Sequence, residues 1–414
     1  MTSTTGTDGL SVRTASASDA LSRDAAGLLP ELVALRRALH AAPEVGLDLP
    51  ATQRAVLDAL AGLDLEITLG TRTTSVVAVL RGRHPGPAVL LRGDMDALPV
   101  VEQTGLDYAS TNGAMHACGH DLHTAGLVGA VRLLHERRSE LAGSVVFMFQ
   151  PGEEGLGGAK IMLEEGLLDA AGERPVAAFA IHVGPGEAGV FSTRAGTIAA
   201  GSNQLHVTVH GAGGHGSKPD GALDPVPAVA EIVTALQAMV TRRFSVLDPI
   251  VLTVTQLRAG TAINVIPASA SLGATVRTLS VESTDRVERE AQSLAAGIAA
   301  AHGCTAEVRF VRQYPVTVNA AGPTTEVVRL LGERFGEDRV HLMPAAMMGS
   351  EDFSFVLEQV PGTFFSVGAS PAGVDPATAA WNHSPQVLFD DAVLADQAVA
   401  FAHLALSWLA PARG

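Results

Sequence analysis

Nine consecutive residues, His116 to Thr124 (HACGHDLHT), contain three imidazoles, one thiol and one carboxylate. Cys118 and His120 are two positions apart, so on a helix their side chains would point in different directions. Gly119 between them favours a turn, in which both side chains could face one point. A thiolate and an imidazole so arranged are good ligands for a borderline metal such as Zn²⁺. The stretch therefore predicts a metal site, although Cys118 alone would suit a small buried apolar position equally well.

Polar side chains also follow three predicted strands at the point where each strand ends. Asp94 and Asp96 come directly after the apolar run PAVLLRG. Glu153 and Glu154 follow SVVFMFQPG, and His182 ends AFAIHVG. Each residue alone could be a loop carboxylate, a turn cap or a structural histidine. Because ligands bind at the carboxyl ends of strands in open α/β sheets, we expect these three segments to converge on one site.

The candidate site combines nitrogen, oxygen and sulfur ligands. Its members are Cys118, His120, Glu154, His182 and His383 (from WNHSPQ), with Asp96 and Glu153 nearby. Four ligands complete a structural zinc site, so a surplus indicates either two metal ions or an open catalytic position. In the adjacent glutamate pair, one carboxylate would bind metal while the other acts as a general base.

A largely parallel sheet flanked by helices is predicted to carry this site. Helical periodicity in LLPELVALRRALHAAPE and HTAGLVGAVRLLHERRSEL alternates with the apolar runs TSVVAVLRG and PAVLLRGDMDALP, which are typical of strands buried on both faces. We expect residues 26–193 and 313–414 to form this α/β domain. Residues 194–312 show the order β-α-β-β-α-β, which predicts an inserted ferredoxin-like α+β module.

Composition excludes several classes of protein. The chain of 414 residues has a net charge of −15 and no cluster of Lys and Arg, so neither nucleic acid nor an anionic membrane is an expected partner. No apolar run approaches the roughly eighteen residues that span a bilayer. Residues 1–25 are rich in Ser, Thr, Ala and Gly and lack the features of a signal peptide, which predicts a disordered tail. The presence of only two cysteines favours a reducing cytoplasm.

The remaining histidines and the second cysteine have ordinary explanations. His40, near a helix end, is expected to be solvated. His206 and His210 alternate with apolar residues in QLHVTVH, so we expect them on the solvent face of a strand. Nothing near Cys304 would activate it, which favours a structural thiol.

Six motifs, in order along the chain, resemble one known family. RGDMDALPVVEQTG, HACGHDLHTAGLVGA, FQPGEEGLGGAKIMLEEG, HGAGGHGSKPDGALDPV, NVIP and GSEDFSF are similar to segments of the aminoacylase/hippurate-hydrolase branch of the co-catalytic metallopeptidases. The resemblance runs from about Leu28 to the C-terminus. It implies a catalytic domain with two divalent metal ions (zinc, manganese, cobalt or nickel) and an inserted lid domain that usually forms a homodimer. Leu122 departs from the family, which commonly has Gly there; a larger side chain would narrow the pocket and leave the ligands intact.

The resemblance also implies roles for individual residues. It makes Glu153 the general base and Asp96 the acidic residue that orients the site. His215 matches a lid histidine that helps to stabilise the tetrahedral intermediate, often across the dimer. Asn264 and Arg277 match lid positions that contact the substrate, with Arg277 as a clamp for its carboxylate. The metal ligands that it implies are Cys118, His120, Glu154, His182 and His383.

The implied activity is hydrolysis of the amide bond of small-molecule N-acyl amino acids. Water acidified by the metal would lose its proton to Glu153. The acyl group stays open between acetyl, benzoyl, longer acyl and indole-acetyl groups. One alternative is a metallo-dipeptidase or carboxypeptidase on the same scaffold. Another is a cysteine hydrolase with Cys118 as nucleophile and His120 or His123 as base. A third is a non-catalytic metal-binding protein, which the additional glutamate disfavours.

Overall fold

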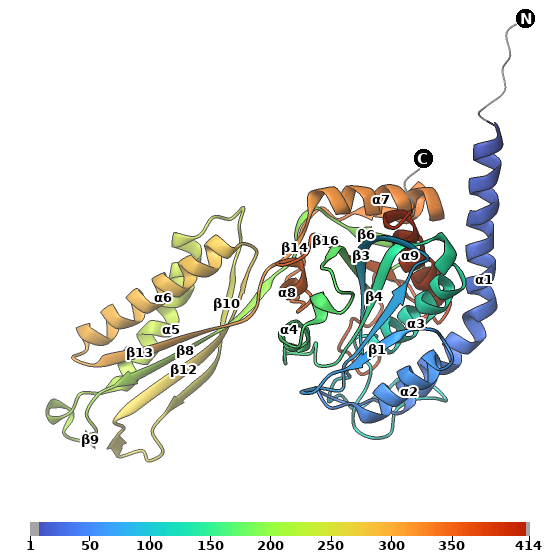
Figure 1. Ribbon diagram of the computed structural model, residues 1–414. Coiled ribbons are helices and arrows are strands. Elements are labelled where there is room, and N and C mark those ends of the chain that lie inside the picture. Colours follow the sequence, from blue (N-terminus) through green and yellow to red (C-terminus); the bar gives the residue numbers. More distant parts are fainter. Residues whose placement is uncertain (1–7, 411–414) are drawn as a thin grey trace, which may run out of the picture. The chain divides into compact units, whose positions relative to one another are not determined.

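The computed structural model describes residues 8–410, and the side chains of residues 20–410, in two compact units (Figure 1). The first unit comprises Met1–Gly196, Asn319–Pro344 and Phe355–Gly414. The second comprises Thr197–Val318 and Ala345–Ser354. Each unit has a hydrophobic core of its own. Among the described residues, no helix is long and apolar enough to cross a membrane.

The first unit is built on a twisted sheet whose central strands are parallel. From one edge to the other, its strands are β1 (Glu66–Leu69), β2 (Val76–Arg81), β4 (Ala142–Gln150), β3 (His84–Asp94), β5 (Pro175–Gly184), β16 (Gly362–Gly368), β6 (Phe191–Thr193) and β15 (Val340–Leu342). The neighbours β4, β3, β5 and β16 run parallel, whereas β1, β2 and β4 pair antiparallel. The Val- and Leu-rich part of β3 is buried on both faces, as its sequence predicts. The predicted fold class, a largely parallel α/β sheet, is confirmed.

Helices cover this sheet, and a small residue lets the most buried of them pack closely on its neighbouring helices. The helices of the chain outside β8–β13 are α1 (Asp8–Ala41), α2 (Pro50–Leu60), α3 (His120–Glu136), α4 (Gly158–Glu164), α7 (Ala321–Phe335), α8 (Ser354–Leu357) and α9 (Val393–Trp408), with short 3₁₀ turns η1 (Arg138–Glu140), η2 (Leu167–Asp169) and η4 (Glu337–Arg339). The helix α3 is buried along nearly its whole length, between the sheet and the helices α1 and α9. A Cβ at Gly129 would lie 2.8 Å from Ala398 and 2.8 Å from Leu32, so glycine permits this close approach.

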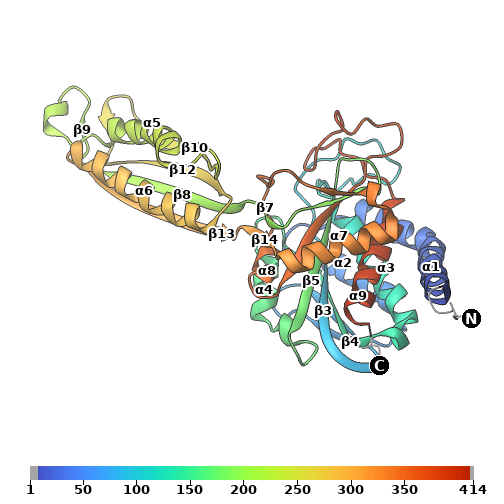
Figure 2. The ribbon, with the colours of Figure 1, turned by 90° about the horizontal axis from the view of Figure 1, so that it is seen from above.

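The second unit has the predicted ferredoxin-like order of elements. They are β8 (Gly201–His210), α5 (Pro225–Arg243), β10 (Val251–Ala259), β12 (Ser269–Thr278), α6 (Val281–Ala301) and β13 (Thr305–Tyr314). The strands form an antiparallel sheet in the order β10-β12-β8-β13, and α5 and α6 both pack on one face of it (Figure 2). Asp224 caps α5 and Ser280 caps α6 through side-chain oxygens. His206 is half-buried and His210 exposed, on the face away from the helices.

Shorter elements make up the rest of the described secondary structure. They are β7 (Gly196–Ala199), β9 (Gly214–His215), η3 (Pro219–Gly221), β11 (Val265–Ile266) and β14 (Thr317–Asn319). Residues 345–354, which we expected in the α/β domain, group with the second unit, because Met347 exchanges backbone hydrogen bonds with Ile198 and Ala200 at 2.9 and 3.0 Å.

The N-terminal segment differs from the predicted disordered tail of residues 1–25. Residues 1–7 lie outside the described part of the chain, but α1 begins at Asp8. Leu21 is 4% exposed and Ala25 is fully buried, so this part of the helix packs on the core. The alanines that resembled low-complexity sequence are also strong helix formers, and this packing favours the helix.

Candidate metal centre

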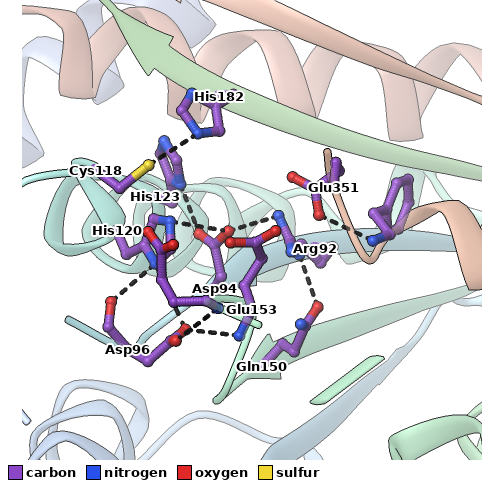
Figure 3. Close-up of polar contacts among 12 residues, drawn as sticks. Arg92, Asp94, Asp96, Cys118, His120, His123, Gln150, Glu153, His182 and Glu351 are labelled. Carbon is purple, nitrogen blue, oxygen red and sulfur yellow. Dashed lines mark hydrogen bonds and ion pairs between the residues drawn. The ribbon is translucent and has the colours of Figure 1, made fainter. Parts of the chain in front are cut away.

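The strand ends bring the predicted residues to one edge of the sheet. The strands β4, β3 and β5 are parallel neighbours, so their carboxyl ends lie side by side. Asp96 follows β3, Glu153 follows β4, and His182 lies near the end of β5. Figure 3 shows these side chains turned toward one another, together with Cys118 and His120 from the start of α3. This is the edge of a parallel sheet at which ligands bind.

A left-handed glycine brings the thiol and the imidazole together. Gly119 has φ +84° and immediately precedes α3. A Cβ at this position would lie 2.2 Å from Val183 Cγ2, so only glycine fits. The resulting turn leaves Cys118 Sγ 3.4 Å from His182 Nε2 (Figure 3). The possible ligand atoms of Cys118, His120 and His182 all lie within 4.8 Å of one another.

Asp96 orients the site through the backbone. Its two carboxylate oxygens accept hydrogen bonds from the backbone N–H groups of Glu153 and Glu154, at 2.9 and 3.0 Å. Its carbonyl oxygen lies 2.8 Å from His120 Nδ1, and because a carbonyl can only accept, Nδ1 carries the proton. His120 Nε2 is buried without a hydrogen-bond partner and is therefore the atom available to a metal. Asp96 thus contacts Glu153, Glu154 and His120 and fits the orienting role predicted for it.

His383 reaches the cluster from a strained turn. It has φ +72°, the one positive φ at a non-glycine residue in the described chain. Its backbone N–H donates to the carbonyl of Ala117 at 2.9 Å, and Nε2 lies 3.2 Å from Glu154 Oε1. The neighbouring Asn382 donates to the carbonyl of Cys118 at 3.2 Å. A conformation of this kind costs about 1–3 kcal/mol and persists where surrounding contacts hold it, commonly at functional sites.

The five predicted ligands form overlapping groups of three. Cys118, His120 and His182 form one group, and Cys118, Glu154 and His383 form another. His120, Glu153 and Glu154 form a third. Within each group the possible ligand atoms lie within 4.8 Å of one another. Shared members place two adjacent centres side by side, as two metal ions with a common ligand require.

The charges in the cluster fit divalent cations. Burial disfavours the Cys118 thiolate, but His182 and His120 hold the pKa of this thiol well below its usual range. Hydrogen bonds to Cys118 and Glu154 raise the pKa of His383 to about 10. The cluster thus favours positive charge beside the Cys118 thiolate. Metal ions would supply that positive charge, and the mixed S, N and O donors suit borderline ions such as zinc.

His123 lies beside the cluster, and both of its ring nitrogens have hydrogen-bond partners. Its Nδ1 lies 2.5 Å from Asp94 Oδ1, and its Nε2 accepts the backbone N–H of Val183 at 2.8 Å. Burial lowers the pKa of His123 to about 4, so the ring is neutral. Asp94 is itself paired with Arg92 at 2.7 Å. Both ring nitrogens of His123 therefore have hydrogen-bond partners. The sequence contains no signal that distinguishes His123 from the five predicted metal ligands.

The prediction that His40 is solvated is wrong. This residue is 2% exposed, with Nδ1 2.7 Å from Asp121 Oδ2 and Nε2 3.2 Å from Glu102 Oε1. Arg36 Nε also lies 2.7 Å from Asp121. Both ring nitrogens face carboxylates and can donate to them, which favours the protonated imidazole. Burial opposes this charge, but Asp121 raises the pKa of His40. These contacts fix the side chain of Asp121, the residue that follows His120.

The predicted lid residues all lie in the second unit. His215 in β9 pairs with Val265, and the backbone N–H of Gly216 donates to the carbonyl of Asn264 at 2.8 Å, so His215 and Asn264 are neighbours. Arg277 lies on β12, half-buried, with Nη1 buried and without a hydrogen-bond partner. Burial lowers the pKa of this guanidinium. The roles of these residues toward the metal centre stay predictions from the resemblance.

Comparison with known proteins agrees with this geometry. Residues 90–407 match the model of Peptidase family M20/M25/M40. The chain is 35% identical to N-acetylcysteine deacetylase of Bacillus subtilis, over 91% of this chain and 96% of the relative. It is 36% identical to thermostable carboxypeptidase 1 of Saccharolobus solfataricus, over 91% and 95%. A solved structure from Bacillus subtilis, described as a dinuclear metal-binding peptidase from the M20 family, aligns with a TM-score of 0.79 and 32% identity, over 92% of this chain and 99% of that one.

Proposed function

The chain belongs to peptidase family M20/M25/M40, as its motifs predicted, and from this premise we propose that it hydrolyses N-acyl amino acids to a carboxylate and a free amino acid. The metal-dependent hydrolysis of amide bonds is the activity of the family. The single observation that supports the proposal best is the position of Glu153. This buried carboxylate adjoins the five predicted ligands, and its backbone N–H is held by Asp96.

Two divalent ions fit the cluster. Cys118, His120 and His182 would bind one ion, and Glu154 and His383 would bind the other. When bound, such ions supply Lewis acidity, which acidifies water and polarises an amide carbonyl. The donor set excludes magnesium and calcium as preferred ions but leaves zinc, manganese, cobalt and nickel.

Glu153 moves the proton in this proposal. It takes a proton from the attacking water, whose oxygen forms the new bond to the acyl carbon. When the C–N bond breaks, Glu153 returns that proton to the departing nitrogen, so the proton count balances. Asp96 keeps the Glu153 backbone in place throughout, with its carboxylate 2.9 Å from the Glu153 nitrogen.

The second unit supplies the remaining roles in this proposal. His215 would stabilise the oxyanion and Asn264 would contact the substrate. Arg277 would bind the substrate carboxylate bidentately, and its buried guanidinium nitrogen without a hydrogen-bond partner supports that role. A homodimer formed through this unit belongs to the same proposal, as does a cytoplasmic location, which the two unpaired cysteines of the described chain support.

Two alternatives are separable from this proposal. A carboxypeptidase or dipeptidase would use the same centre, as the Saccharolobus relative suggests. A cysteine hydrolase would use Cys118, but His123 could not serve as its base, because both of its ring nitrogens are occupied.

The test is release of free amino acid by metal-loaded protein from paired substrates. N-acetyl, N-benzoyl and N-hexanoyl methionine would be compared with dipeptides that end in methionine. Turnover of the N-acyl substrates that a chelator abolishes and added metal restores supports the proposal. Turnover of the dipeptides alone would replace it with the peptidase alternative. Chelator resistance combined with inactivation by a thiol alkylator would replace it with the cysteine hydrolase.

A further inference from the structure

An exposed indole belongs to the turn that carries the predicted metal ligand His383. Trp381 lies two residues before His383 and is 65% exposed. Scattered exposed apolar side chains are ordinary on a protein surface. An exposed tryptophan leaves a large apolar surface in contact with water unless its ring packs against a partner. Its place two residues before a predicted metal ligand indicates that this partner is a bound substrate.

The backbone under this indole is fixed to the metal site. The N–H of Ser384 donates to the carbonyl of Trp381 at 3.0 Å and closes a four-residue turn. His383 is the third residue of that turn and takes the positive φ of 72°. Asn382, the second residue, donates from Nδ2 to the carbonyls of Cys118 and Val183 at 3.2 and 3.1 Å. The start of the indole side chain is therefore held at a fixed position relative to the ligands.

The chemistry of the indole suits the apolar parts of an N-acyl amino acid. The amino-acid half always carries a carboxylate, which needs charged or polar partners. An aromatic or long acyl group offers apolar surface, which an indole face buries well. An acetyl group offers only one methyl for such a contact. The exposed indole, carried on a backbone held by hydrogen bonds, thus matches a large apolar acyl group.

We propose that Trp381 forms a wall of the acyl-binding site and selects aromatic or long-chain acyl groups over acetyl. This inference rests on the proposed hydrolysis of N-acyl amino acids. It narrows the substrate class, which the motifs leave open between acetyl and larger acyl groups. Trp381 acts here on binding and specificity and takes no part in the movement of protons.

The test is the ratio of kcat/KM for N-benzoyl methionine to kcat/KM for N-acetyl methionine. A loss of one apolar contact in a pocket changes discrimination by about 10- to 200-fold, so Trp381→Ala should lower this ratio by about 10- to 100-fold. Trp381→Phe should keep most of it, because a ring is retained. Val176→Ala is the matched control, since Val176 is 47% exposed at the opposite end of the strand that carries His182, and it should leave the ratio unchanged.

The ratio separates specificity from folding, because a partly unfolded preparation loses both activities equally. An unchanged ratio in Trp381→Ala would overturn the inference. So would an effect that follows the side chain of the amino acid in a series of N-acetyl substrates. If metal-loaded wild-type protein hydrolyses no N-acyl amino acid, the proposed function fails and this inference fails with it. Hydrolysis of both substrates with an unchanged ratio refutes the inference alone.

Discussion

Replacement of Asp96 should destabilise the loop that carries the general base. In the structure its carboxylate accepts the backbone N–H groups of Glu153 and Glu154 at 2.9 and 3.0 Å, and Asp96 is 1% exposed. A buried donor left without a partner costs about 1–3 kcal/mol. Glu154 is partly accessible to water, so the loss of the partner of its N–H should cost an amount near the lower end of this range. Asp96→Ala should therefore lower the free energy of unfolding by about 2–4 kcal/mol.

Asp96→Asn provides a graded comparison. Its amide offers one acceptor oxygen, so one of the two N–H groups keeps a partner and about half of the loss, roughly 1–2 kcal/mol, is expected. Asp375→Ala is the matched control, because Asp375 Oδ1 accepts one backbone N–H at 2.9 Å in an exposed loop. That variant should lose less than about 1 kcal/mol, since water can replace the carboxylate.

The assay is urea denaturation of metal-free protein, followed by circular dichroism. Metal content after reconstitution and amide hydrolysis would be measured on the same preparations. The expected order of stability is wild type and Asp375→Ala, then Asp96→Asn, then Asp96→Ala. If Asp96→Ala unfolds within about 0.5 kcal/mol of wild type, the positioning role assigned to this carboxylate is wrong.

Three further changes test other parts of the structure. Gly119→Ala should lower the free energy of unfolding by more than about 2 kcal/mol and weaken metal binding in titrations, because strain at φ +84° adds to a 2.2 Å clash with Val183. The control Gly105→Ala, at φ +73° with open space, should show the effect of strain alone. Equal losses of stability in the two variants would contradict the clash. His40→Gln should destabilise metal-free protein most below pH 6.5, and the difference in free energy of unfolding from wild type should shrink as pH rises through the raised folded-state pKa of His40. If urea titrations show that this difference grows with pH, the imidazole is not protonated in the folded protein. Arg277→Lys should raise KM about 10-fold or more for substrates with a carboxylate, and an equal loss on their amides would exclude the clamp.

Much of the site could be predicted because it depends on local sequence. Asp96 and Glu153 follow strands whose apolar residues mark their ends, and parallel strands bring those ends together. Gly119 between Cys118 and His120 indicated a turn, and the structure has that turn with a positive φ. These features need only short stretches of sequence and the geometry of one sheet.

Other features depend on contacts that short stretches do not encode. His40 is buried by Asp121, which lies 81 positions away in the chain. His123 resembles a metal ligand in sequence, and only the structure shows that its ring nitrogens have hydrogen-bond partners in Asp94 and Val183. The prediction for His40 failed because a distant carboxylate decided the outcome.

The central claim is that a two-metal centre hydrolyses an amide with Glu153 as its base. The most direct test is to measure metal equivalents and kcat together for wild-type protein and Glu153→Gln. The account predicts about two equivalents in both proteins, with kcat lower by about 10²- to 10⁴-fold in the variant. Near-normal turnover in Glu153→Gln, or wild-type protein that binds no metal after reconstitution, would contradict it.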